Sequence, residues 1–131
     1  MRTRHIIAAI TFFIFIDALW IVFFARPFYE KELAINFANK PNALAAIILI
    51  YFALIAGLYF FVLVHVGTRQ RLKDILLRSV LYGFCVYGIY TLTNYLIFER
   101  WSMLMVFADI AWGVTICFLT TLIFSALCRF D

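Results

Sequence analysis

The sequence predicts an all-α, polytopic membrane protein with four transmembrane helices in an up-down antiparallel bundle. Hydrophobic residues make up 67% of its 131 residues and charged residues only 14%, whereas soluble domains have about 25% charged residues. The chain also contains four long apolar segments, each of at least the ~20 residues that a helix needs to cross a bilayer. One transmembrane domain accounts for the whole length.

The first helix is expected over about residues 6–24. Its apolar run is too long for a signal peptide, so it is expected to be a retained span. The second helix is expected over about residues 42–66. Pro41 suits its start, and Gly67 suits its end.

The third and fourth helices are expected over about residues 75–98 and 102–127. The few residues between them predict an antiparallel hairpin. The only sizeable external loop is expected over about residues 26–40, because Pro27 follows the first apolar run. Its alternating apolar and polar residues suit either a short amphipathic element at the membrane surface or a plain solvated loop.

The distribution of basic residues predicts the orientation. Seven lie on the side that holds both termini and four on the other side. The richer side is expected to be cytoplasmic, which places both termini inside, although the moderate bias leaves dual insertion as an alternative. The two sets are Arg2, Arg4, Arg69, Arg71, Lys73, Arg78 and Arg129, and Arg26, Lys31, Lys40 and Arg100. Their scatter excludes a nucleic-acid-binding patch.

Two carboxylates lie inside the predicted spans, Asp17 in the first and Asp109 in the fourth. An ionisable group at membrane depth costs a few kcal/mol or more and indicates a functional site. Tryptophan follows each acid three residues later, as Trp20 and Trp112. Each acid is seven residues from the predicted outer end of its helix, so both are expected at one depth, about 10 Å inside the outer boundary.

Other polar side chains are expected at a similar depth. Tyr87, Tyr90 and Asn94 share one face of the third helix by their spacing, while Thr91 flanks this face and Tyr51 projects from the second helix. The sequence therefore predicts one polar network or cavity in the outer half of the membrane. The expected site residues are Asp17, Trp20, Tyr51, Tyr87, Tyr90, Thr91, Asn94, Asp109 and Trp112. The alternative is that these groups only join the helices by hydrogen bonds.

No metal site or cofactor is expected. The three cysteines lie in or beside apolar segments without a Cys-x-x-Cys spacing, so they are expected to be small packing residues. His5 and His65 lie near the cytoplasmic face, away from the aspartates. Trp101 is expected to anchor the hairpin at the membrane interface.

An ordered set of short motifs resembles a known family. The motifs are Asp17-Ala18-Leu19-Trp20, Phe28-Tyr29, Tyr90-Thr91-Leu92-Thr93-Asn94, Trp101 and Asp109-Ile110-Ala111-Trp112-Gly113. Together they resemble a family of small bacterial membrane proteins known as domain of unknown function 2177, over nearly the whole chain. The resemblance implies a four-helix protein of the bacterial inner membrane and no established activity. Thr91 departs from the family pattern, which usually has an aspartate at that position.

Three classes of function stay open. The intramembrane carboxylates favour a transporter-like protein that handles a small cation or a proton. Four helices enclose little volume, so a pathway would need a homodimer. The alternative is a scaffold that binds a membrane lipid or a partner's transmembrane helix. An intramembrane enzyme using paired acids has the least support, because no Gly-x-Gly-Asp pattern, Ser/His pair or metal-ligand cluster occurs, and no catalytic residue is assigned.

Overall fold

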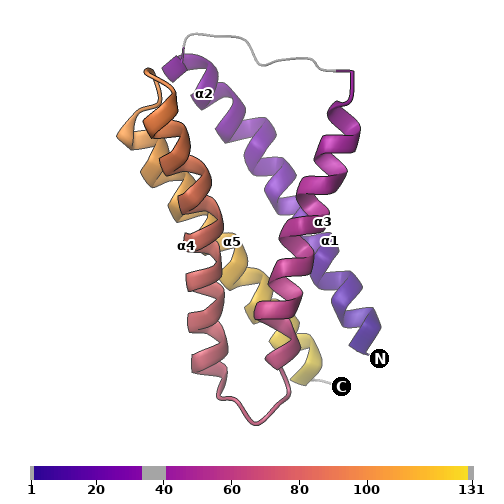
Figure 1. The fold of residues 1–131 in the computed structure, drawn as a ribbon. Helices are drawn as coiled ribbons and strands as arrows, with labels where there is room; N and C mark the ends of the chain where they lie inside the picture. Colours follow the sequence, from indigo (N-terminus) through magenta and orange to yellow (C-terminus); the bar gives the residue numbers. More distant parts are fainter. Residues whose placement is uncertain (1, 34–40, 130–131) are drawn as a thin grey trace.

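The computed structural model describes residues 2–33 and 41–129. Four helical spans within these ranges are long and apolar enough to cross a membrane: Thr3–Lys31, Ala43–His65, Leu72–Ile97 and Met103–Arg129. Successive spans run in opposite directions, and both termini lie at one end of the bundle (Figure 1). The predicted all-α, four-helix class is therefore confirmed. Which end faces the cytoplasm stays a prediction from the charges.

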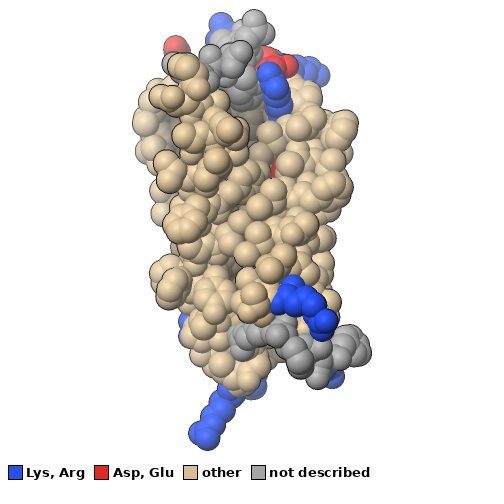
Figure 2. Space-filling model, turned by 90° about the vertical axis from the view of Figure 1, so that its right-hand side faces the viewer, with Lys and Arg blue, Asp and Glu red and all other residues tan. Residues whose placement is uncertain are grey.

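The two ends of the bundle differ in what they hold. We call the end with both termini the terminal end, and the end with the connection between the last two helices the turn end. On the face shown in Figure 2, lysine and arginine side chains lie at both ends, and the surface between them is almost entirely uncharged. This distribution suits a chain that spans an apolar layer.

The first span is longer than the sequence predicted. It comprises the α-helix α1 (Arg2–Trp20), the π-helix η1 (Ile21–Ala25) and the α-helix α2 (Arg26–Leu33), which form one tilted rod (Figure 1). The predicted end near Phe24 and the predicted loop from residue 26 are therefore wrong. Proline lacks an N–H and normally clashes with the carbonyl four residues earlier. Here the wide π turn precedes Pro27, so the proline falls in the first turn of α2, where it is tolerated.

The remainder of the predicted loop, residues 34–40, lies outside the described residues. The described part of that loop is helical, and its exposed Arg26 and Glu30 side chains form an ion pair of 3.4 Å one turn apart. An exposed pair of this kind adds little to stability.

The second span is held to the bundle mainly by its terminal-end half. It comprises α3 (Ala43–Phe61) and a short 3-10 turn, η2 (Leu63–His65). Leu58, Val62 and Val66 are buried, whereas every side chain from Leu44 to Ile50 is exposed. Gly67 follows with a φ of 81°, a left-handed conformation that glycine adopts without a steric penalty. The predicted role of this glycine in ending the span is confirmed.

The last two spans, α4 (Leu72–Ile97) and α5 (Met103–Arg129), form the predicted antiparallel hairpin. Their backbones meet at two glycines. A Cβ atom on Gly83 would lie 2.5 Å from the carbonyl oxygen of Gly113, and one on Gly113 would collide with the Tyr87 ring. Small residues allow membrane helices to approach this closely and gain packing energy. At the turn, the Ser102 hydroxyl accepts a hydrogen bond of 3.2 Å from the Met105 N–H and caps α5.

Two apolar clusters lie along the bundle. The larger cluster fills the terminal-end half and includes the fully buried side chains of Phe13, Leu58, Ile116 and Phe124. The smaller cluster, at the turn end, joins α2 to the hairpin and contains Ala25, Tyr29, Trp101, Met105 and Val106. The space between the two clusters holds the polar groups described next.

The contact between Gly83 and Gly113 makes a testable prediction for stability. Gly83→Ala should lower the free energy of unfolding by about 1–3 kcal/mol, because the added methyl group meets backbone rather than a flexible side chain. Gly88→Ala is the matched control, since its Cβ would meet only Ile110 atoms at 3.9 and 4.0 Å. The control should be neutral or more stable by up to about 1 kcal/mol. Unfolding of the purified variants in detergent measures both, and equal effects would contradict the close approach.

The charge distribution predicts the orientation of the bundle. Green fluorescent protein fused to the C-terminus should fluoresce and alkaline phosphatase fused there should be inactive, because the terminal end carries the larger basic set. An active phosphatase fusion with a dark fluorescent fusion would reverse the predicted orientation. Activity of both fusions would show dual insertion.

Candidate functional site

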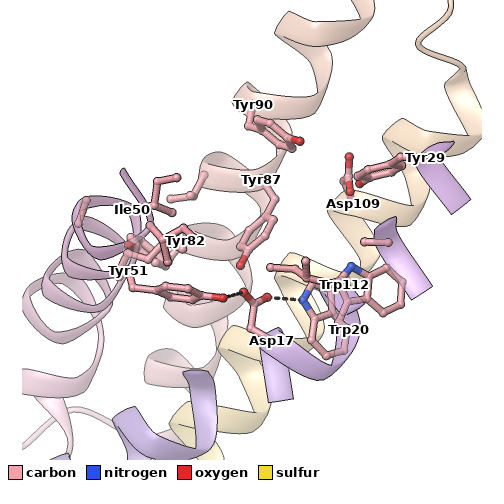
Figure 3. A pocket seen from close by; sticks show the side chains of 16 residues that line it. Asp17, Trp20, Tyr29, Ile50, Tyr51, Tyr82, Tyr87, Tyr90, Asp109 and Trp112 are labelled. Carbon is pink, nitrogen blue, oxygen red and sulfur yellow. Dashed lines mark hydrogen bonds between the residues drawn. The ribbon is translucent and has the colours of Figure 1, made fainter. Parts of the chain in front are cut away.

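A cavity of about 600 Å³ lies between the two apolar clusters. Side chains from all four spans line it (Figure 3). The cavity brings together most of the residues that the sequence singled out: Asp17, Trp20, Tyr51, Tyr87, Tyr90, Asp109 and Trp112. That it binds a ligand stays a prediction.

Asp17 joins three helices. Its side chain is only 5% exposed, and both of its carboxylate oxygens accept a hydrogen bond. The Tyr51 hydroxyl on α3 donates to Oδ2 at 2.7 Å, and the Trp112 Nε1–H on α5 donates to Oδ1 at 2.8 Å (Figure 3). Asp17 follows His5, Ala9 and Phe13 along the buried stripe of α1, so helical periodicity directs it into the bundle.

Asp109 has a different set of hydrogen-bond partners. It is 4% exposed, and the Thr91 hydroxyl donates to its Oδ2 at 2.8 Å. The Trp101 indole N–H in turn donates to the Thr91 hydroxyl oxygen at 3.1 Å. Trp101 is only 7% exposed, so the prediction that it anchors the hairpin at the membrane interface is wrong. The short turn after α4 directs this indole back into the bundle rather than outward.

The two acids do not lie at one depth. Asp17 lies at the level of Tyr51 and Trp112, to which it is hydrogen-bonded, whereas Asp109 lies nearer the level of Tyr90 (Figure 3). Trp112 follows Asp109 by three residues, which is about 4.5 Å along a helix. The predicted equal depth failed because it was counted from Phe24, and the first span continues beyond that residue and is tilted.

Two tryptophans stack on each other in the wall of the cavity. The rings of Trp20 and Trp112 are nearly parallel, with ring centroids 4.6 Å apart and planes within 5°. Offset stacking of this kind stabilises a pair by about 0.5–1.5 kcal/mol beyond the burial of its surface. The stack forms a flat aromatic wall on one side of the cavity (Figure 3).

Two predicted site residues lie outside the lining of the cavity. Thr91 is fully buried behind Asp109 and orients its carboxylate. Asn94 is half-buried and does not line the cavity, because it lies a further turn toward the end of α4. Thr91 thus belongs to the hydrogen-bond network of Asp109 rather than to the cavity wall, and a role of Asn94 in the site stays a prediction.

Tyr29 and Tyr82 also line the cavity, although the sequence did not predict them as site residues. Tyr82 reaches across to α3, where its hydroxyl donates to the carbonyl of Leu54 at 2.7 Å and its ring lies over Gly57. The sequence predicts a loop at Tyr29, whereas the structure places this residue in α2. The small residues Ala53 and Gly57, four positions apart on α3, were the signal in the sequence that a large side chain of a neighbouring helix could pack there.

The cavity has an exposed side next to α3. Ile47 and Ile50 line the cavity and are also exposed on the surface of the bundle. From the side of the molecule shown in Figure 2, a carboxylate lies deep in a narrow hollow among uncharged side chains. The larger apolar cluster closes the cavity toward the terminal end.

The lining of the cavity contains two carboxyl groups and no lysine, arginine or histidine. Among the described residues, no side chain forms an ion pair with Asp17 or Asp109. The described residues also hold no group of three or more His, Cys, Asp or Glu side chains that could bind a metal ion. The negative charge of the cavity therefore meets only neutral donors and aromatic rings.

Comparison with known proteins identifies the class of protein. The model of the predicted membrane protein family DUF2177 matches residues 3–126. The chain belongs to this family, as its motifs suggested. No curated protein and no solved structure matches the chain.

The hydrogen bond between Tyr51 and Asp17 makes a prediction for stability. Tyr51→Phe should lower the free energy of unfolding by about 1 kcal/mol, the usual scale for side-chain hydrogen bonds between membrane helices. Tyr95→Phe is the matched control, because Tyr95 is 42% exposed on α4 and its hydroxyl donates to no described residue. Titration of the two purified variants with a denaturing detergent measures the difference. Equal stability would show that α3 does not depend on this bond.

Proposed function

We propose that this protein is a small transporter-like protein of the bacterial inner membrane that takes up a positively charged solute or a proton at Asp17 and Asp109. The observation that supports the proposal is a cavity with two buried carboxyl groups and no basic side chain in its lining. A buried carboxylate without a cationic partner is costly unless it is protonated or a cation binds beside it. A cavity of this composition therefore favours positive over neutral or negative solutes.

The packing also suits transport. The cavity is exposed beside α3 and is closed toward the terminal end by Phe13, Leu58, Ile116 and Phe124. A site that is closed toward one end of the bundle fits one of the two states that alternating access requires. Because one chain offers only four spans, we propose that two copies form the complete pathway.

A second candidate function has its own observation. The half of α3 nearest the turn end is exposed on every face, as expected for a helix that awaits a lipid or a partner's transmembrane helix. A scaffold of this kind would bind its partner through apolar surface. Its binding would therefore not depend on the charge of the two acids.

Substitution of the acids separates these proposals. Asp17→Asn and Asp109→Asn should each lower uptake into proteoliposomes about tenfold or more, because each replaces a buried charge by a neutral amide. The measured probes are protons, with an internal pH dye, and radioactive sodium and rubidium ions and tetraphenylphosphonium. Asp74→Asn is the matched control, since Asp74 pairs with Arg71 on the exposed terminal end.

Folding of each variant is checked by gel filtration before uptake is compared. If none of the four probes enters faster than into empty vesicles, or if all variants equal the wild type, transport at these acids is excluded. Retention of a lipid by the wild type and by both acid variants would favour the scaffold.

A further inference from the structure

We infer that the cavity selects a lipophilic organic cation, with its charged centre at Asp109 between Tyr29 and Tyr90 and its apolar body against the stacked Trp20 and Trp112. This inference rests on the proposed function and narrows it to a substrate class. It follows from the difference between the two acids, the aromatic lining, the volume of the cavity and the route by which a ligand enters.

The two acids differ in what is left to bind a ligand. Both oxygens of Asp17 are occupied by the donors of Tyr51 and Trp112. Asp109 accepts a bond only on Oδ2, from Thr91, among the described residues. Its Oδ1 is therefore available to a ligand, although the residue is 4% exposed and lines the cavity. A cation can bind there without displacing a protein donor.

Two tyrosine rings lie on the cavity wall with Asp109. Tyr90 points into the cavity from α4, and Tyr29 lies close to Asp109 on the side of α2 (Figure 3). Both rings pack on Trp101, with centroid separations of 5.3 Å for Tyr29 and 6.0 Å for Tyr90. Trp101 is itself fixed by its bond to Thr91. The faces of aromatic rings attract organic cations, and rings arranged around a carboxylate recognise substituted ammonium groups.

The rest of the cavity suits the apolar body of such a molecule. Its volume of about 600 Å³ lies within the ~300–1,000 Å³ of sites for drug-sized ligands. Two carboxylates at different depths supply only a few of the roughly six oxygen ligands that a calcium or magnesium ion takes. The flat stack of Trp20 and Trp112 offers instead a surface on which an aromatic group can lie.

The exposed side of the cavity suits a ligand dissolved in the membrane. Ile47 and Ile50 on α3, with Ile21 and Ala25 on η1, line the cavity. The α3 residues are exposed to the surroundings of the bundle, which in a membrane are lipid. A hydrophilic ion would have to cross this apolar border, whereas a lipophilic cation would be concentrated there.

Equilibrium binding of radioactive tetraphenylphosphonium to the purified full chain in detergent tests the inference. Wild type should bind saturably, and Asp109→Asn should bind at least about tenfold more weakly. Tyr90→Leu should weaken binding about fivefold to thirtyfold through loss of one ring face. Asp74→Asn and Tyr95→Leu are the controls, because they remove the same groups outside the cavity. The uncharged analogue triphenylphosphine oxide should not compete.

The outcomes distinguish this inference from the function on which it rests. If tetraphenylphosphonium does not bind, or binds equally to Asp109→Asn, the organic-cation class is wrong. The proposed function would survive that result if sodium, rubidium or proton uptake still depended on Asp109. Effective competition by triphenylphosphine oxide would show that only apolar contacts select the ligand. A larger loss with Asp17→Asn than with Asp109→Asn would overturn the assignment of the charged centre.

Discussion

The arrangement of the helices depends on the Asp17 carboxylate, which accepts two hydrogen bonds. It ties α1 to α3 through Tyr51 and to α5 through Trp112. The half of α3 near the turn end contributes no buried residue, so its position there depends on Tyr51 and on the bond from Tyr82 to the Leu54 carbonyl. In an apolar surrounding, no water competes for these donors. A polar contact between helices thus replaces the packing that α3 lacks in this half.

Asp17 and Asp109 line one cavity but differ in their hydrogen-bond partners. Asp17 is saturated by donors from its own protein, as a joint between helices would be. Asp109 is oriented from behind by Thr91 and Trp101 and keeps one oxygen toward the cavity. The stacked Trp20 and Trp112 line the same cavity as both acids. One cavity therefore holds an acid with donors on both oxygens and, among the described residues, an acid with a donor on one oxygen.

The sequence alone predicted the four spans because apolar length is a strong and local signal. It also predicted that Asp17, Tyr51, Asp109 and Trp112 would gather, since buried polar groups need partners. It did not predict which donor meets which acid, because that depends on the tilt of the first span and the rotation of each helix. The inward position of Trp101 was missed for a similar reason. The direction of a side chain in a tight turn is set by the packing of both flanking helices.

The π-helix at Ile21–Ala25 has a consequence for what a helical wheel can reveal. A π turn contains one residue more than an α-helical turn, so it rotates the residues that follow it by about 100° around the helix axis. On an uninterrupted α-helix Tyr29 would lie about 120° around the axis from Asp17, but with the extra residue the angle falls to about 20°. Ala25 and Tyr29 are accordingly buried on the same side as Asp17. The one extra residue of the π turn therefore rotates the ring of Tyr29 onto the face of the span that carries Asp17.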